Sequence, residues 1–395
     1  MCIRDRAATA DEARSMRRFP MKVQVCGNCW LSQLTVVIDP RELFANYAYR
    51  SSINKAYLGH CRRMAHSLRD KLGIGADDLV VDIAGNDGAL LSVFKEELGV
   101  RVVNVDPAEN LAEIAESSGV PTITRFWGPF AAAEVVTEFG KPALITATNV
   151  FAHVDDVREF VTSAQNCLSD DGVLMLEFPY GVDFIEHREF DTIYFEHLSY
   201  MLLEPVCHLA DSLGMTLFDV EKQDIHGGTV RVFLANAGTR EVQPSVAEFR
   251  QLEASGGYHD RNIYVAWNRE IDILIRELRR EITGLRKRGA SIAAFAASAK
   301  GNTLLNACDF GPETVEYIVD DTPEKIGRFS PGNGIPIVDR TVLAERPPDY
   351  LLILAWNFAS ELIATTPEYS AAGGKFIVPI PSFRVIDPNG EAPDG

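Results

Sequence analysis

Apolar runs that alternate with helical segments are the feature that most constrains the fold of this chain. The first run, Leu79-Val80-Val81-Asp82-Ile83, precedes a glycine-containing turn and a helix expected over 88–98. Further strands are expected over 100–106, 143–147 and 173–177. Strands that alternate with helices in this way are typical of an α/β domain with a doubly wound sheet.

The last third of the chain repeats the alternation after a long amphipathic helix. Apolar positions recur among many charges over 266–288, and Gly289 ends this helix. Strands are expected over 291–297, 315–320 and 350–354. Because 395 residues suffice for two or three cores, we expect two or three domains. For a division into three, the expected bounds are 1–60, 61–240 and 241–395.

Composition and charge exclude several classes of function. The chain is 46% apolar and 24% charged, which is ordinary for a globular protein. Its formal net charge is −18 and it has no long basic run, so no nucleic-acid partner is expected. No apolar run reaches the roughly 18 residues of a membrane span, and no secretory signal is visible. We expect a cytoplasmic monomer or homodimer that does not bind membranes.

Seven cysteines are spread along the chain, and Cys26 and Cys29 are the close pair. The Cys26-x-x-Cys29 spacing is half that of a four-cysteine zinc site, and a second pair is absent. Either the metal site is truncated or the pair holds no metal. Residues 1–6 resemble a translated sequencing adapter, so Cys2 takes no part in the functional argument.

The turn after the first strand is a candidate nucleoside-binding loop. Its glycines allow the backbone to approach a ligand closely, and Asp106 at the end of the next strand suits ribose hydroxyls. The spacing departs from the dinucleotide fingerprint G-x-G-x-x-G and fits S-adenosylmethionine better. A tight turn of any α/β fold is the alternative. The candidate residues are Asp82, Ala84, Gly85, Asn86, Asp87, Gly88, Asp106 and Asn149.

Polar side chains suited to proton transfer follow two of the expected strands. Tyr194, Glu196 and His197 come after the strand over 173–177, and His153 follows the strand over 143–147. Open α/β sheets bind ligands at these strand ends, and the three residue types can exchange protons. The alternatives are a solvated loop and, for His153, a helix-capping or buried neutral imidazole.

A second candidate loop, Ser298-Ala299-Lys300-Gly301-Asn302-Thr303, lies before a helix in the last third. Backbone donors at a helix N-terminus together with a lysine suit a phosphate or pyrophosphate. Asp320 ends the following strand, at a spacing usable for a ribose. The alternative is a capped helix with an exposed lysine.

These motifs resemble the three-domain sugar C-methyltransferases of bacterial deoxysugar pathways, over about residues 25–385. The most specific matches are Phe44-x-x-Tyr47-x-Tyr49-x-Ser51-Ser52, Asn86-Asp87-Gly88, Asn149-Val150-x-Ala152-His153, Glu177-x-Pro179-Tyr180, the run from Phe190 to Tyr200, and the run from Ala299 to Asn306. The resemblance implies a zinc-type N-terminal domain, here truncated, a central S-adenosylmethionine methyltransferase domain and a C-terminal Rossmann-like α/β domain. Two departures are the missing first cysteine pair and Phe195, where the family has histidine.

The resemblance implies S-adenosylmethionine-dependent methylation of C-3 in a nucleoside-diphosphate keto-deoxysugar. Carbon methylation needs a base that removes the proton next to a carbonyl, and His197 is the expected base. Glu196 would orient His197, while Tyr194, Tyr47, Tyr49 and His153 would bind the enolate or steer the methyl donor. The expected substrate-binding residues are Tyr180, Ser298, Lys300, Asn302 and Asp320.

Two other functions stay open at the level of sequence. A dinucleotide in the C-terminal α/β unit would make the protein an NAD-dependent oxidoreductase or epimerase of nucleotide sugars. Loss of activity together with the N-terminal domain would leave a nucleotide-sugar-binding protein. Binding of S-adenosylmethionine, compared with binding of NAD, separates the first alternative from methyl transfer.

Overall fold

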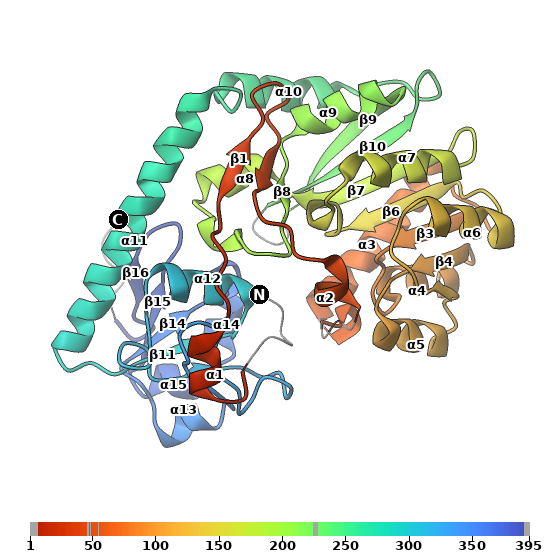
Figure 1. Cartoon of the computed structure of the whole chain (residues 1–395). Helices are drawn as coiled ribbons and strands as arrows, with labels where there is room; N and C mark the ends of the chain where they lie inside the picture. Colours follow the sequence, from red (N-terminus) through yellow and green to blue (C-terminus); the bar gives the residue numbers. More distant parts are fainter. Residues whose placement is uncertain (1–6, 46, 48, 54, 224–227, 391–395) are drawn as a thin grey trace. The chain divides into compact units, whose positions relative to one another are not determined.

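The computed structural model describes residues 7–45, 47, 49–53, 55–223 and 228–390, so the adapter-like residues 1–6 lie outside it. The chain forms two compact units (Figure 1). The central unit comprises residues 23–182 and 196–259, and the C-terminal unit comprises the described residues of 1–22, 183–195 and 260–395. This partition differs from the boundaries expected at residues 60 and 240, and the three-domain division stays a prediction.

A seven-stranded sheet forms the middle of the central unit, with the order β5-β4-β3-β6-β7-β10-β9. Its strands are β3 (Leu79–Ile83), β4 (Arg101–Val105), β5 (Thr122–Ile123), β6 (Leu144–Thr148), β7 (Val173–Pro179), β9 (Met215–Gln223) and β10 (Thr229–Asn236). Only β10 runs antiparallel to its neighbours. The strand order reverses between β3 and β6, and open α/β sheets bind ligands at such a switch point.

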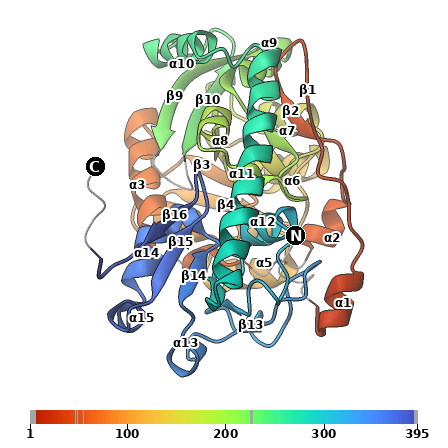
Figure 2. The ribbon, with the colours of Figure 1, turned by 90° about the vertical axis from the view of Figure 1, so that its left-hand side faces the viewer.

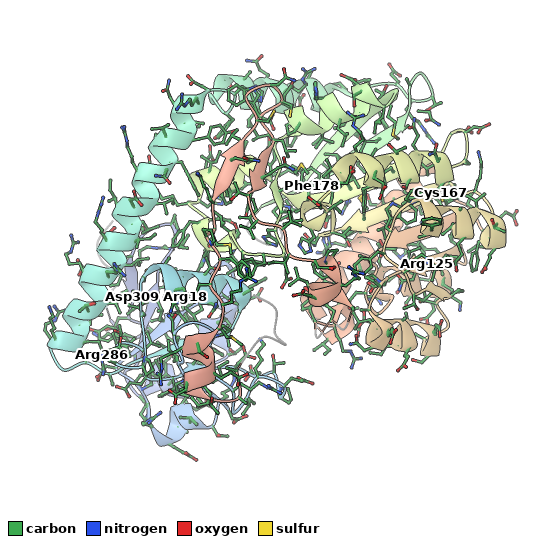
Figure 3. The ribbon with its side chains drawn as sticks, in the orientation of Figure 1. Arg18, Arg125, Cys167, Phe178, Arg286 and Asp309 are labelled. Atoms are coloured by element: carbon green, nitrogen blue, oxygen red, sulfur yellow. The ribbon has the colours of Figure 1, made fainter. Side chains whose placement is uncertain are left out.

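Helices connect these strands and bury their apolar sides against the sheet. They are α3 (Lys55–Leu72), α4 (Ala89–Glu96), α5 (Glu109–Ser117), α6 (Pro129–Phe139), α7 (Val157–Cys167) and α9 (Leu203–Ser212), and α10 (Pro244–Ser255) follows β10. All five residues of β3 are buried, as expected for an inner parallel strand covered on both faces. Phe178 of β7, labelled in Figure 3, is likewise fully buried. The expected doubly wound α/β architecture is therefore confirmed here.

A small antiparallel sheet in the central unit joins the N-terminal segment to the candidate catalytic segment. Its strands are β1 (Val23–Val25), β2 (Ser32–Leu34) and β8 (Ser199–Tyr200). Ser32 pairs with Tyr200, and the Leu34 amide donates to the Leu198 carbonyl at 2.8 Å. The cysteine turn between β1 and β2 is thus fixed to the same sheet that holds residues 198–200.

The C-terminal unit contains a six-stranded sheet with the order β13-β12-β11-β14-β15-β16. The strands are β11 (Ile292–Phe295), β12 (Ile318–Val319), β13 (Ile337–Val338), β14 (Tyr350–Ile353), β15 (Lys375–Val378) and the antiparallel β16 (Arg384–Ile386). The long helix α11 (Arg261–Lys287) packs on this sheet (Figure 2), because Leu274 and Leu278 share a core with Ile292 and Leu352. Helix α12 (Ala299–Ala307) follows β11 directly.

Shorter elements complete the two units. The central unit holds α2 (Pro40–Phe44), η2 (Ser51–Ile53) and η3 (Phe151–His153), and α8 (Gly181–Glu186) crosses the boundary between the units. The C-terminal unit holds α1 (Ala10–Ser15), η4 (Phe190–Thr192), α13 (Val342–Glu345), η5 (Trp356–Phe358), α14 (Ala359–Ala364) and α15 (Pro367–Ala371). Within the described residues, no helix is long and apolar enough to cross a bilayer.

A buried ion network fixes the end of β7 to the neighbouring elements. Glu177 is fully buried and accepts from Arg231 of β10 at 2.7 and 3.0 Å. His60 of α3 lies 2.8 Å from the other oxygen of Glu177, and Arg231 also donates to Glu221 of β9. Burial opposes ionisation, but contacts with His60 and Arg231 hold the pKa of Glu177 below its usual value. One carboxylate therefore joins α3, β7 and β10, and Arg231 extends the network to β9.

Arg231→Met should lower the free energy of unfolding by about 3–5 kcal/mol, because it leaves the Glu177 carboxylate buried with half of its partners removed. Denaturant unfolding monitored by circular dichroism measures this loss. Arg62→Met is the matched control, since Arg62 forms a solvent-exposed pair with Glu97. Equal effects of the two substitutions would contradict the importance of the buried network.

Candidate active site

The loop after β3 is bent so tightly that its backbone enters the left-handed region three times. Ala84, Asn86 and Gly88 have φ angles of 53°, 57° and 78°. At Gly85, a Cβ atom would lie 2.5 Å from Oδ1 of Asn104 and 2.7 Å from Oδ2 of Asp82. Only glycine fits that position without a shift of its neighbours. The loop thus presents backbone rather than side chain at the switch point of the sheet.

Two buried carboxylates lie against this loop. Oδ2 of Asp106 accepts from the Asn86 amide at 2.9 Å, and its Oδ1 accepts from the Ala108 amide at 2.8 Å. Oδ1 of Asp82 accepts from the Thr146 hydroxyl at 2.7 Å. Burial raises the pKa of Asp106 to about 6 and that of Asp82 to about 7. Both groups therefore change protonation close to neutral pH.

Asn86 and Asp87 fasten a second segment onto the loop. Oδ1 of Asn86 accepts from the Ser51 amide at 3.0 Å, and its Nδ2 donates to the Tyr49 carbonyl at 3.1 Å. Oδ2 of Asp87 accepts from the Ser52 amide at 3.1 Å. The segment that carries Tyr49 therefore lies against the predicted donor loop. Sequence motifs far apart in the chain meet at this point.

The loop fits the predicted methyl donor in chemistry. Oδ1 of Asp87 and Oδ1 of Asn104 are buried and have no hydrogen-bond partner among the described residues. S-adenosylmethionine carries an amino group and ribose hydroxyls that can donate to such oxygens. Asn149, at the end of β6, has a φ of 55° and donates its amide to the Glu177 carbonyl at 2.8 Å. The residues that would hold the donor are those named from the sequence, and Asn104 is added to them.

The predicted catalytic residues of the central unit converge. The Tyr47 hydroxyl donates to Oε2 of Glu196 at 3.0 Å, and the rings of His153 and His197 have centroids 5.1 Å apart. The ring of Tyr47 lies 6.5 Å from that of Tyr49. Burial lowers the pKa of His153 to about 4, so this imidazole is neutral at neutral pH. A phenol, a carboxylate and two imidazoles therefore share one cluster.

Backbone contacts explain why this cluster forms. The Leu198 amide donates to the Ala152 carbonyl at 2.8 Å, which places His197 beside the η3 turn that carries His153. The ring of Phe44 stacks on His153 with a centroid distance of 5.7 Å. Asn110 exchanges two hydrogen bonds with the backbone of Tyr47, at 2.8 and 3.1 Å. No pattern in the sequence indicates Asn110, because its partner lies 63 positions away.

Tyr194 and Phe195 belong to the C-terminal unit. The Tyr194 amide donates to the Thr192 carbonyl at 3.1 Å. Phe195 packs edge-on against Phe19, with ring centroids 5.2 Å apart. The position that departs from the family pattern is therefore an apolar packing position in this protein.

The structure places Tyr180 in the core, contrary to its expected role in substrate binding. Its side chain is 2% exposed, and its hydroxyl donates to the buried Glu253 at 2.9 Å. Glu253 also accepts from the amides of Leu203 and Glu204 at the start of α9. Tyr180 thus helps to hold a helix terminus. The sequence could not show this because Glu253 lies 73 positions away.

The predicted phosphate loop has a regular helix start. Oγ of Ser298 accepts from the Gly301 amide at 3.0 Å and so caps α12. Lys300 lies 3.6 Å from a carboxylate oxygen of Glu189 and 4.7 Å above the ring of Trp356. Asn302 is buried, and its Oδ1 has no hydrogen-bond partner among the described residues. Lys300 is half-enclosed, which differs from the exposed lysine of the alternative interpretation.

Asp320 directly follows β12 and accepts hydrogen bonds from neighbouring groups of the C-terminal unit. Its oxygens accept from the Ala297 amide at 2.7 Å, the Thr322 amide at 2.9 Å and Lys325 at 3.0 Å. Burial opposes ionisation, but Lys325 and the Thr322 contacts lower its pKa below the usual value. Asp320 therefore supports the loop before α12 as a carboxylate, and its role toward ribose stays a prediction.

Cys26 and Cys29 lie on one turn between β1 and β2. The Asn28 amide donates to Sγ of Cys26 at 3.5 Å, and the Trp30 amide donates to the Cys26 carbonyl at 3.1 Å. Contacts with the backbone of Cys29 and Asn28 lower the pKa of Cys26. No third histidine, cysteine or carboxylate joins them in a metal-holding group within the described ranges. Two thiols fill half of a tetrahedral zinc site, so the residues present do not fit zinc alone.

Asp106→Asn should weaken the binding of S-adenosylmethionine by about 1.5–3 kcal/mol, because the charged acceptor is lost and an amide donor faces the backbone amides. For the unchanged protein, affinity should fall as the pH is lowered through 6, where Asp106 becomes protonated. This pH dependence should weaken in the variant. Titration calorimetry at several pH values measures both effects, with the exposed Asp70→Asn as control. An unchanged dissociation constant would refute the assignment of Asp106.

Comparisons with known proteins assign a family to the chain. Residues 57–217 match the family described as "Methyltransferase domain", and residues 224–381 match "C-methyltransferase C-terminal domain". C-methyltransferase NovU of Streptomyces niveus is 37% identical over 377 residues, which cover 95% of this chain and 90% of that protein.

Among solved structures, magnesium protoporphyrin IX methyltransferase of Synechocystis, with bound S-adenosylmethionine, is 12% identical at a TM-score of 0.34. The match covers 46% of this chain and 82% of that one. An S-adenosylmethionine-dependent methyltransferase of Clostridium acetobutylicum has the same identity and score, over 45% of this chain and 91% of that one. These scores are too low to carry an argument, whereas the relation to NovU is decisive. The chain belongs to the family of C-methyltransferases, as its motifs predict, and the protein is a methyltransferase.

Proposed function

We propose that this protein methylates C-3 of a nucleoside-diphosphate keto-deoxysugar. The observation that carries the proposal is the cluster of Tyr47, Glu196, His153 and His197, which lies in the same unit as the loop that fits the methyl donor. Carbon becomes a nucleophile readily when a neighbouring carbonyl stabilises the carbanion, so a keto-sugar suits these proton-transfer groups. Family membership disfavours the oxidoreductase and epimerase alternatives.

Bound S-adenosylmethionine supplies an electrophilic methyl group. The residues Asp82, Asn86, Asp106 and Asn104 would hold this donor through its amino and hydroxyl groups. The loop after β3 is restrained, because its Asn86 amide donates to Asp106 and Gly85 has no room for a side chain. Such restraint would fix the donor's position, which bimolecular methyl transfer requires.

In this proposal His197 takes the proton from the carbon next to the carbonyl. Glu196, held by the Tyr47 hydroxyl, orients His197 or accepts from a sugar hydroxyl. His153 is neutral and lies beside His197, so it can accept or donate a hydrogen bond without adding charge. Tyr49 and Tyr194 remain the candidates to stabilise the enolate oxygen.

His197→Ala should lower turnover by roughly 10²–10⁴, the usual contribution of a general base. Affinity for both ligands should change little, because the lost interaction belongs to the transition state. Exchange of the sugar's α-proton with deuterated water isolates deprotonation from methyl transfer, and this exchange should stop. His153→Ala and Tyr194→Phe are the comparison variants.

The exchange assay assigns the base among these residues. If His197→Ala keeps full exchange while another variant abolishes it, the role moves to that other residue. If all three variants exchange at the original rate, this cluster does not deprotonate the substrate. Failure of the unchanged protein to methylate any nucleotide-linked keto-sugar would overturn the proposed function itself.

We also propose that Lys300 contacts the diphosphate of the nucleotide sugar. Lys300→Met keeps the apolar stem over Trp356 but removes the charge. It should weaken binding of the nucleotide sugar about tenfold or more, as expected for a charge-assisted hydrogen bond. Affinity for S-adenosylmethionine should stay unchanged, and calorimetry with each ligand checks both. A parallel loss of both affinities, or of neither, would contradict the assignment.

A further inference from the structure

Two buried carboxylates near Lys300 each have one oxygen without a hydrogen-bond partner among the described residues. Glu189 is 4% exposed and Asp191 is fully buried. Oδ2 of Asp191 accepts from the indole of Trp356 at 2.8 Å, and Oε2 of Glu189 lies 3.6 Å from Lys300. Oε1 of Glu189 and Oδ1 of Asp191 have no hydrogen-bond partner among the residues that the structure describes. The nearest ring nitrogen to Oε1 is Nδ1 of His187, at 3.7 Å.

Such oxygens are costly in a folded protein. A buried acceptor without a partner costs about 1–3 kcal/mol, and more when it is charged. Burial raises the pKa of Glu189 to about 7 and raises the pKa of Asp191, while Lys300 opposes both shifts. The backbone amides near Asp191 also stabilise its charge, although the Thr192 amide donates to the Glu189 carbonyl at 3.0 Å. Unused buried acceptors of this kind indicate a partner that the polypeptide does not supply.

A purely structural role for Lys300 explains this arrangement poorly. Its 3.6 Å separation from Glu189 is longer than a hydrogen bond, and its ammonium group lies 4.7 Å from the centre of the Trp356 ring. A lysine that served only to neutralise the two acids would be expected to donate to them directly. The lysine thus keeps donor capacity that another anion can use.

The charges around these oxygens restrict the chemistry of that partner. The ammonium group of Lys300 repels a metal cation, and no metal-holding group occurs in the described part of the chain. The two carboxylates repel an anion placed directly on them. Neutral hydroxyl groups are donors that avoid both penalties. Lys300, at the start of α12, can at the same time face an anionic group.

We propose that Glu189 and Asp191 accept hydrogen bonds from hydroxyl groups next to the diphosphate of the nucleotide sugar, with Lys300 as counter-charge to the diphosphate. The inference deepens the proposed function and rests on it for the identity of the ligand. The hydroxyls belong either to the ribose or to the hexose. Both sources offer the same chemistry, and binding of different ligand fragments separates them.

The test compares Glu189→Gln and Asp191→Asn with the unchanged protein by titration calorimetry. The probes are the diphosphates of the five common nucleosides, the glucose conjugates of these diphosphates, and S-adenosylmethionine. Each variant should bind the best glucose conjugate about 10–100-fold more weakly, as expected when a charged acceptor becomes an amide. Loss for the conjugate alone assigns the hexose hydroxyls, and equal loss for conjugate and diphosphate assigns the ribose.

Asp309→Asn is the matched control, because Asp309 (labelled in Figure 3) is an exposed acid of the same unit. Its left-handed backbone accommodates asparagine, and its ligand affinities should not change. Thermal unfolding verifies that each variant is folded.

Unchanged affinities in folded Glu189→Gln and Asp191→Asn would overturn the inference. It would also fail if affinity for S-adenosylmethionine fell equally, or if the unchanged protein bound no glucose conjugate. The proposed function is tested separately by methyl transfer. If the variants lose the glucose conjugate while no keto-sugar is methylated, the hydroxyl site stands and the proposed function fails.

Discussion

The buried carboxylate of Glu177 is the interaction on which the central unit depends. An ionised group without access to water is tolerated only when it is paired, and Glu177 receives Arg231 and His60. Its backbone carbonyl accepts from Asn149, whose left-handed conformation begins the turn toward His153. The position of the turn after β6 that carries His153 is therefore set by the same residue that joins β7 to β10 and α3.

A second constraint acts on the loop after β3, where no space is available for a side chain at Gly85. Gly85 lies against the side chains of Asn104 and Asp82, and Asp106 draws the Asn86 amide toward the sheet. The side chain of Asn86 in turn forms hydrogen bonds with the backbone of Tyr49 and Ser51, which hold this segment against the loop. Hydrogen bonds thus link the sheet, the loop and the segment of Tyr49. In the proposed function, a methyl donor held by this loop would approach a defined point relative to the cluster.

The sequence predicts secondary-structure elements and motifs better than it predicts which side chains contact each other. The strand over 79–83 and the turn after it follow from apolar runs and glycines, which are local signals. His153 follows a parallel strand, where open α/β sheets place ligand-binding residues, whereas His197 is brought to it by the hydrogen bond from the Leu198 amide to the Ala152 carbonyl. By contrast, the contacts of Tyr180 with Glu253 and of Asp191 with Trp356 join residues 73 and 165 positions apart.

The periodicity of apolar residues carries no information on contacts between residues so far apart in the chain. Tyr180 was therefore expected at the substrate, whereas the structure buries it. For Glu189 and Asp191, neither composition nor spacing shows that one of their oxygens lacks a partner among the described residues. Whether such an oxygen has a hydrogen-bond partner is defined only by the folded structure.

His153 lies beside His197, and burial favours the uncharged form of its imidazole. Burial lowers the pKa of His153 to about 4, so its imidazole is a weak base and carries no charge during turnover. General-base catalysis is most efficient when the pKa of the base lies near the working pH, which disfavours His153 for that step. With ring centroids 5.1 Å apart, two imidazolium ions would repel each other. In the proposed mechanism, a proton taken by His197 would meet a neutral neighbour, because burial keeps His153 uncharged.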